Sequence, residues 1–228
     1  MERHLLDIVQ LAWCRELALD DNALTAGGRV TRVDDTADRL QVLRLGETTA
    51  VVGPGDAVAA LAHIPDTALD ASTVRTATGG HGARTHVLHY CADWVDASRV
   101  RDPLISHDAR DLAELRRRCP PDDTIDATPA DGDRVFVLLD DDHHPLSAAG
   151  YGEIHAILAD VVALTVPEHR RLGLAATVAT LATHDALDAG LVPQWRVRRD
   201  NLAGRGLAAA LGYEECGSHV TVQLRDSV

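Results

Sequence analysis

The sequence predicts an α/β protein built on a mixed, mostly antiparallel sheet that contains one parallel pair of strands and is flanked by helices. Residues 101–228 show the order helix, three consecutive strands, helix, strand, helix, strand. Consecutive strands favour antiparallel hairpins, whereas a strand–helix–strand unit requires a parallel pairing. Residues 1–100 show a separate α/β pattern, so we expect two regions that divide near residue 100.

The first region begins with an amphipathic helix, expected over residues 4–19 because apolar residues recur there at helical spacing. A turn with Asp56 as candidate N-cap then begins a helix over residues 57–63. The glycine-rich stretch 71–84 is expected to be a loop before a strand at 85–90. Three short runs rich in β-branched or alternating residues predict further strands: 29–33, 40–45 and 48–52.

The second region begins with a helix over residues 108–118, which has Leu112 and Leu115 on one side and ends before two prolines. The acidic stretch 122–133 is expected to be a loop. The remaining strands are expected at 134–139, 146–157, 161–166, 193–197 and 218–224. One further helix is expected to end near Gly190, with Leu174, Val178 and Leu181, flanked by Ala175 and Ala182, on its buried face. A short helix is expected over residues 203–211.

Charge is distributed unevenly along the chain. The net charge of -13 argues against a nucleic-acid partner, because phosphates would be repelled. Residues 101–160 carry 14 acidic and 6 basic side chains, whereas residues 161–228 carry 7 of each. A neutral, arginine-bearing segment suits an anionic ligand and an acidic one a cationic ligand, although ordinary surface charge for solubility is the alternative.

The four cysteines are far apart and form no CxxC pair, which argues against a zinc site or a disulfide framework. No apolar run reaches the ~18 residues that a membrane helix needs. We read no signal peptide. We therefore expect a cytoplasmic protein with no metal and no membrane partner.

Residues 166–175 carry the clearest chemical pattern. A strand ending at Val166 is followed by a tight segment and a helix that begins near Gly173, and a helix start offers unpaired N–H groups to phosphate oxygens. Gly173 lets the backbone come close, while the small Ala175 keeps side-chain bulk away from an anion. Arg170 and Arg171 add charge-assisted donors. The pattern predicts a phosphate site.

Residues 164–175 (LTVPEHRRLGLA) resemble the acetyl-CoA-binding motif of the GNAT superfamily of N-acetyltransferases. Residues 195–213 (WRVRRDNLAGRGLAAALGY) resemble its second signature, a strand closing on an asparagine and a short helix ending in Leu-Gly-aromatic. The resemblance covers residues 101–228 and implies the GNAT fold. Residues 1–100 are similar to N-terminal regions of some bacterial members, and we interpret them as a degenerate half of the same fold.

The resemblance implies that acetyl-CoA is the cosubstrate. The strand ending at Val166 would splay from the one around residues 195–197, and the pantetheine arm would pair with the freed edge. The pyrophosphate would rest on N–H groups from Arg171 to Ala175, and Asn201 would face the pantetheine, with a helix N-cap as its alternative role. The implied cofactor-binding residues are Leu164, Thr165, Val166, Arg170, Arg171, Leu172, Gly173, Leu174, Ala175 and Asn201.

Two positions depart from the family pattern. Arg171 and Leu172 stand where many members have a glycine and then a basic residue. Ala208 stands where many members have a tyrosine that protonates the departing thiolate, and Tyr213 lies too far along to replace it.

Acetyl transfer to an amine requires a base, usually a carboxylate or histidine on neighbouring strands. The candidates are Glu153, His155 and Asp160, and alternation would put Glu153 and His155 on one face of their strand. We favour Glu153 narrowly, with a solvated surface role as the alternative for each. The pair His143-His144 suggests a metal, but a solvated hairpin tip explains it better.

These features predict an N-acetyltransferase that transfers the acetyl group of acetyl-CoA to a primary amine by direct attack in a ternary complex. The acidic residues 101–160 favour a cationic acceptor, either a small molecule or a basic peptide amine. An acyl-CoA-binding sensor or scaffold without turnover is the alternative. A third interpretation makes residues 1–100 a dimerisation or regulatory region. In the dimerisation case the protein would be a homodimer.

Overall fold

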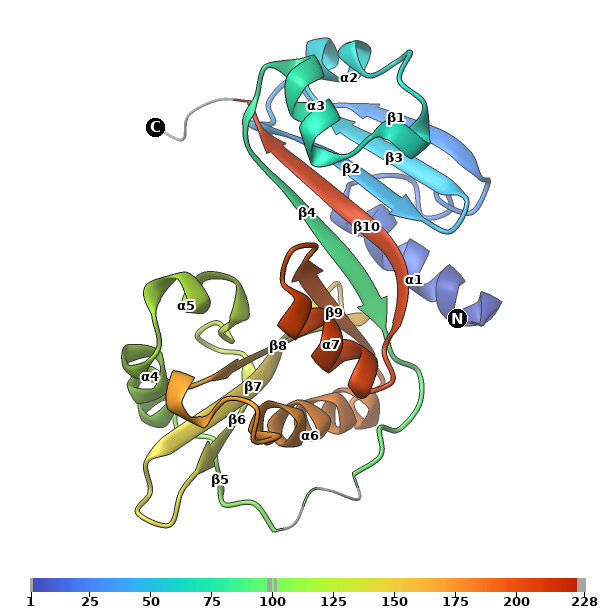
Figure 1. Ribbon diagram of the computed structural model, residues 1–228. Helices are drawn as coiled ribbons and strands as arrows, with labels where there is room; N and C mark the ends of the chain where they lie inside the picture. Colours follow the sequence, from blue (N-terminus) through green and yellow to red (C-terminus); the bar gives the residue numbers. More distant parts are fainter. Residues whose placement is uncertain (1, 98–99, 101, 225–228) are drawn as a thin grey trace. The chain divides into compact units, whose positions relative to one another are not determined.

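The computed structural model describes residues 2–97, 100 and 102–224, without the side chains of residues 125 and 126. The chain forms two compact units, each assembled from separate segments (Figure 1). The first collects Met1–Leu88, Val197–Asn201 and Glu215–Val228, and the second collects His89–Arg196 and Leu202–Glu214. The expected regions are continuous stretches, and residue 101 lies outside the described residues, so the division near residue 100 and the degenerate GNAT-like half stay predictions.

The first unit is a sheet with helices. Strand β3 pairs in parallel with β1 and antiparallel with β2, which pairs antiparallel with β10, and β10 lies beside β4. A cluster of buried aliphatic residues from β2, β3, β10 and the helices fills its core. Its elements are α1 (Arg3–Glu16), β1 (Gly28–Val33), β2 (Arg39–Leu45), β3 (Thr48–Gly53), α2 (Gly55–Ala60), η1 (Asp66–Ala68), α3 (Ala71–Thr78), β4 (His81–Tyr90) and β10 (Glu214–Gln223).

The second unit contains strands in the order β9-β8-β7-β6-β5, and all neighbours are antiparallel except β8 and β9. This mixed sheet confirms the predicted fold class. Its elements are β5 (Ile105–Ser106), α4 (Ala109–Arg118), α5 (Pro121–Ala127), β6 (Arg134–Leu139), β7 (Pro145–Ile154), β8 (Leu158–Thr165), η2 (Pro167–His169), α6 (Leu174–Asp188), β9 (Val192–Arg198) and α7 (Leu202–Ala210).

Helices α4 and α6 pack against β7. Helix α4 contributes Leu112 and Leu115, which the sequence predicts on one side of the helix, to a core with β-strand residues that include Ala148 and Leu164. Tyr151, which alternates with Ala148 and so points to the other face, donates to Asp185 of α6 at 2.6 Å. The strand period therefore places the two helices on opposite faces of β7.

The expected loops over residues 71–84 and 122–133 are wrong, because each contains a helix. Residues 71–78 form α3, in which the Asp70 carboxylate accepts from the Thr73 N–H at 2.8 Å and Gly79, at φ 67°, ends the helix. Within the expected loop 122–133, α5 begins at Pro121. A proline is favoured in the first helical turn because that N–H needs no partner there.

Several boundaries also differ. The N-cap of α2 is Pro54 rather than Asp56, which lies in the first turn. Helix α6 buries Val178 and Ala182 as expected, and Ala179 beside them, whereas Leu174 and Leu181 are only half-buried. The predicted face is therefore only partly correct, because small side chains such as Ala179 carry little hydrophobic signal.

Candidate active site

Strands β8 and β9 diverge shortly after they begin. Their parallel register covers three residue pairs and ends where Asp160 lies opposite Gln194. Strand β8 stays paired with β7 on its other side as far as Thr165. No strand in the described part of the chain pairs with the β9-facing edge of β8 beyond Asp160. That edge can therefore accept an extended ligand arm as an added strand.

The segment between β8 and α6 leaves backbone donors unused. The turn η2 is followed by Arg171 at φ 64° and Gly173 at φ 83°, and the first helical bond runs from the Thr177 N–H to the Gly173 carbonyl at 3.1 Å. Within the described ranges, the main-chain N–H groups from Arg171 to Ala176 donate to no acceptor. Six consecutive donors at a helix start suit an anion with several oxygens.

Arg170 is already engaged. Its Nε donates to the Thr165 carbonyl at 3.2 Å and its Nη2 to the Asp123 carboxylate of α5 at 2.7 Å. Both side chains of this ion pair are more than a third exposed, so water screens it. Asp123 thus competes with any anionic ligand for the charge of Arg170.

The other predicted cofactor-binding residues lie at known places, and their roles stay predictions. Leu164 and Val166 are buried in the core beneath α4, so only their main chains are available to a ligand. The Thr165 hydroxyl lies 2.7 Å from that of Ser147. Leu172 is 65% exposed. Asn201 belongs to the first unit, where its N–H donates to Arg198.

The three candidate bases have different surroundings. Glu153 is exposed on β7. His155 lies in the turn after β7, at φ 53°, so the expectation that it shares a strand face with Glu153 is wrong because the strand ends at Ile154. Asp160 is 17% exposed, and both of its oxygens accept hydrogen bonds.

Asp160 ends a chain of hydrogen bonds that sequence reasoning missed. The Tyr90 hydroxyl donates to Gln194 Oε1 at 2.8 Å, Gln194 Nε2 donates to Asp160 Oδ1 at 2.9 Å, and Arg196 donates to Asp160 Oδ2 at 2.9 Å. Gln194 stands between apolar neighbours in a strand, and that isolated amide was the available signal.

Ala208 stands at the position where the resemblance would place a tyrosine as general acid. Ala208 is fully buried in α7. The Tyr213 hydroxyl lies 2.7 Å from Thr183 Oγ1, and burial raises the pKa of the Tyr213 phenol well above its ordinary value. Tyr213 is therefore committed to the core rather than available for proton transfer.

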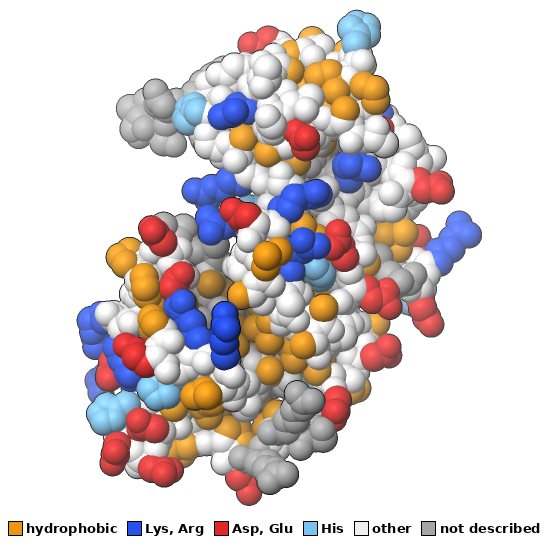
Figure 2. Space-filling model, viewed as in Figure 1, with side chains coloured by type: hydrophobic (Ala, Val, Ile, Leu, Met, Phe, Trp, Pro, Cys, Tyr) orange, Lys and Arg blue, Asp and Glu red, His pale blue; other side chains and the backbone are white. Residues whose placement is uncertain are grey.

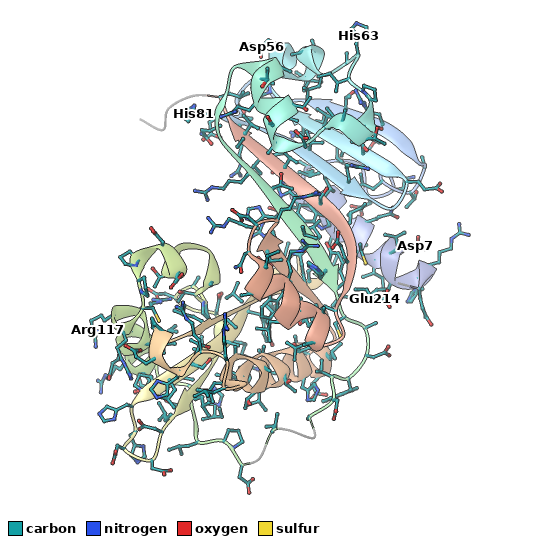
Figure 3. All side chains as sticks on the ribbon, in the orientation of Figure 1. Asp7, Asp56, His63, His81, Arg117 and Glu214 are labelled. Atoms are coloured by element: carbon teal, nitrogen blue, oxygen red, sulfur yellow. The ribbon has the colours of Figure 1, made fainter. Side chains whose placement is uncertain are left out.

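The sequence offered one further candidate cluster, the pair His143-His144. His143 and His144 are exposed in the turn between β6 and β7. No group of three or more potential metal ligands occurs among the residues that the structure describes. Acidic and basic side chains alternate over the part of the second unit that includes α4, where Arg117 points outward (Figures 2 and 3). In the described chain, no helix is both long and apolar enough for a membrane span.

No protein-family model and no curated protein matches this chain significantly. It is similar to a solved GNAT-family acetyltransferase from Novosphingobium aromaticivorans DSM 12444, with 18% identity, a TM-score of 0.50, and coverage of 61% of this chain and 63% of that one. For a GNAT-family acetyltransferase from Colwellia psychrerythraea, the identity is 14% and the TM-score 0.49, and the match covers 64% of this chain and 58% of that one. For a GCN5-related N-acetyltransferase-like protein from Streptococcus suis 89/1591, the identity is 16% and the TM-score 0.46, and the match covers 84% of this chain and 87% of that one.

The second unit, with its parallel pair inside an otherwise antiparallel sheet, defines a mixed α/β fold with an open strand edge. The chain is similar in fold to the solved GNAT-family acetyltransferase from Novosphingobium aromaticivorans DSM 12444. The chain spans less than two thirds of the first two proteins it matches, and the identities are low, so the likeness establishes the fold and not the reaction.

Proposed function

We propose that the protein is an N-acetyltransferase that transfers the acetyl group of acetyl-CoA to a primary amine. The observation that carries the proposal is the pairing of β8 with β9, which stops after three residue pairs and is followed by six unused N–H groups before α6. The open edge would pair with the pantetheine amides, and the donors from Arg171 to Ala176 would bind the pyrophosphate.

The chemistry is direct attack in a ternary complex. The amine must be neutral to attack the thioester carbonyl, so a nearby carboxylate or histidine would accept its proton, directly or through water. Glu153, His155 and Asp160 remain the candidates. With Ala208 in place of a tyrosine, coenzyme A would depart as the thiolate and take its proton from solvent, which is feasible because a thiol with a pKa of about 8.5 is a good leaving group.

The acceptor is proposed to be cationic, in keeping with the acidic residues 101–160. The structure narrows which acids are available, because Asp123 pairs with Arg170 and Asp131 with Arg116. Substitution of the remaining acidic residues should raise the acceptor KM more than substitution of these two.

A second candidate function is acyl-CoA binding without turnover, as in a sensor. The buried Ala208 and the committed Tyr213 favour it, since no tyrosine hydroxyl is available as general acid among the described residues near that position. Both functions use the same open edge and loop.

Thiol release distinguishes the two. The full chain is incubated with acetyl-CoA and, separately, putrescine, spermidine, an aminoglycoside or a lysine-rich peptide, and free coenzyme A is measured. Amine-dependent release supports the transferase. A rise in Tm with acetyl-CoA, together with no release above the protein-free rate for any amine, supports the sensor. Neither release nor a Tm shift would reject both.

A further inference from the structure

The hydrogen-bond chain at the point where β8 and β9 diverge is unusually well buried for polar groups. Gln194 is 0% exposed and Tyr90 is 1% exposed. A buried amide is costly unless each of its polar atoms is paired, and here both atoms of Gln194 have partners. The cluster therefore holds one carboxylate, that of Asp160, in one orientation.

The chemistry of the groups fixes the direction of this chain. An ionised carboxylate can only accept, so the NH₂ group of Gln194 must face Asp160. Its carbonyl oxygen then faces Tyr90, whose hydroxyl must donate. The amide cannot flip without placing its oxygen against the carboxylate. Tyr90 and Gln194 thus fix the orientation of the Asp160 carboxylate, because each hydrogen bond has only one possible direction.

The second oxygen of Asp160 has a different kind of partner. It accepts from Arg196, whose side chain is 39% exposed compared with 17% for Asp160. The exposed guanidinium is the easiest member of the cluster to displace, because water can solvate it when it leaves. One oxygen of Asp160 is thus held by a buried amide, whereas the other is held by a partly exposed cation.

The surroundings favour a cation at this position. Asp160 lies opposite Gly152 in the β7–β8 register, so both project to the same sheet face. A Cβ at Gly152 would lie 2.9 Å from Asp133 Oδ1, so the missing side chain makes room for a second carboxylate on that face. A cationic group next to Asp160 therefore also experiences the charge of Asp133.

We propose that Arg196 occupies, in the resting protein, the place of the acceptor's ammonium group on Asp160, and that the acceptor displaces it. Tyr90 and Gln194 are positioning residues that keep the carboxylate aimed at this exchange. The identification of the displacing cation as an acetyl acceptor rests on the proposed function. The exchange itself is a binding step and involves no covalent chemistry.

The exchange can be measured without turnover, by NMR titration of the full chain with putrescine as the probe. The Arg196 Nε–H signal should shift as putrescine is added. Arg196→Gln should lower the putrescine Kd several-fold, because the internal competitor is gone, while Arg117→Gln, which removes an exposed charge on α4, should leave the Kd unchanged. No shift of the Arg196 signal, or an equal effect of the two variants, would overturn the proposal.

Asp160→Asn separates charge from structure. The asparagine oxygen can still accept from Gln194 Nε2, so the hydrogen-bond chain survives while the charge is lost. This variant should keep its Tm within a few degrees yet lose putrescine binding at least tenfold. Tyr90→Phe should weaken binding less, because it removes only the outermost donor. Unchanged putrescine binding in Asp160→Asn would refute the exchange at this carboxylate.

The outcome is independent of the outcome for the proposed function. If an amine promotes coenzyme A release but Arg196→Gln leaves the acceptor KM unchanged, the transferase stands and the exchange fails. If putrescine displaces Arg196 and no amine promotes release, the exchange stands and the transferase fails. With both in place, Arg196→Gln should lower the acceptor KM and leave the acetyl-CoA KM unchanged.

Discussion

The two ends of β8 differ in whether the polar groups there have hydrogen-bond partners. At the start of the strand, Asp160 and Gln194 have partners for their side-chain oxygens and amide groups. After the end of the strand, six consecutive main-chain N–H groups from Arg171 to Ala176 have no described acceptor. Gln194 in the first arrangement is buried, whereas the second begins with the exposed residues Arg171, Leu172 and Gly173.

This difference follows from the cost of an unpaired polar group. Where water is excluded, an unpaired donor or acceptor costs about 1–3 kcal/mol, so the sequence must supply partners. Where water reaches the backbone, donors can stay unused by the protein at little cost and remain available to a ligand. Removal of a partner inside the buried cluster should therefore lower stability, whereas a charge added at the exposed loop should change ligand binding.

The largest effect is expected at the buried end. Gln194→Leu removes the acceptor of the Tyr90 hydroxyl and one donor to Asp160 from a buried site, and we expect the free energy of unfolding to fall by about 3 kcal/mol. Urea denaturation measures the change. Arg196→Gln, which breaks only the exposed half of the cluster, should cost at most about 0.5 kcal/mol. Equal costs for the two variants would contradict the comparison.

The next effect tests the backbone conformation of the loop. Gly173 has φ 83°, and a Cβ added there would have no heavy atom within 4 Å, so a substitution meets strain rather than a clash. Gly173→Ala should lower stability by about 1–2 kcal/mol. Gly173→Asn, which tolerates this conformation better, should recover part of that loss. Thermal unfolding distinguishes the pair, and equal Tm values would show that the loop relaxes without cost.

The same contrast explains which features the sequence could predict. The exposed loop was readable from local signals, because Gly173 and the helix that follows are adjacent in the chain. The buried cluster joins Tyr90 to Gln194, which are 104 residues apart, and no local pattern reports such a contact. Helix α5 was missed because Pro120 and Pro121 indicate the end of α4. Proline breaks a helix interior but is favoured in the first turn, where α5 begins.

A smaller effect is expected for charge at the exposed loop. Leu172 is 65% exposed, so Leu172→Glu should not disturb packing, yet its carboxylate would repel a pyrophosphate bound to the neighbouring N–H groups. We expect the acetyl-CoA KM, or the Kd if there is no turnover, to rise about fivefold. Leu172→Gln has a similar size without the charge and is the matched control. An equal rise in both variants would point to lost apolar contact instead.

The smallest effect concerns the contact between α5 and the loop. Asp123→Asn removes the charge that holds the Arg170 guanidinium, and a freed guanidinium can turn to a phosphate. Because the pair is exposed and worth about 0.2–1 kcal/mol, the acetyl-CoA Kd should fall only about two- to threefold, with no change in Tm. Isothermal titration calorimetry can resolve this change. A weaker Kd would mean that Asp123 orients Arg170 for the ligand rather than competing with it, so the direction of the change decides which role the ion pair has.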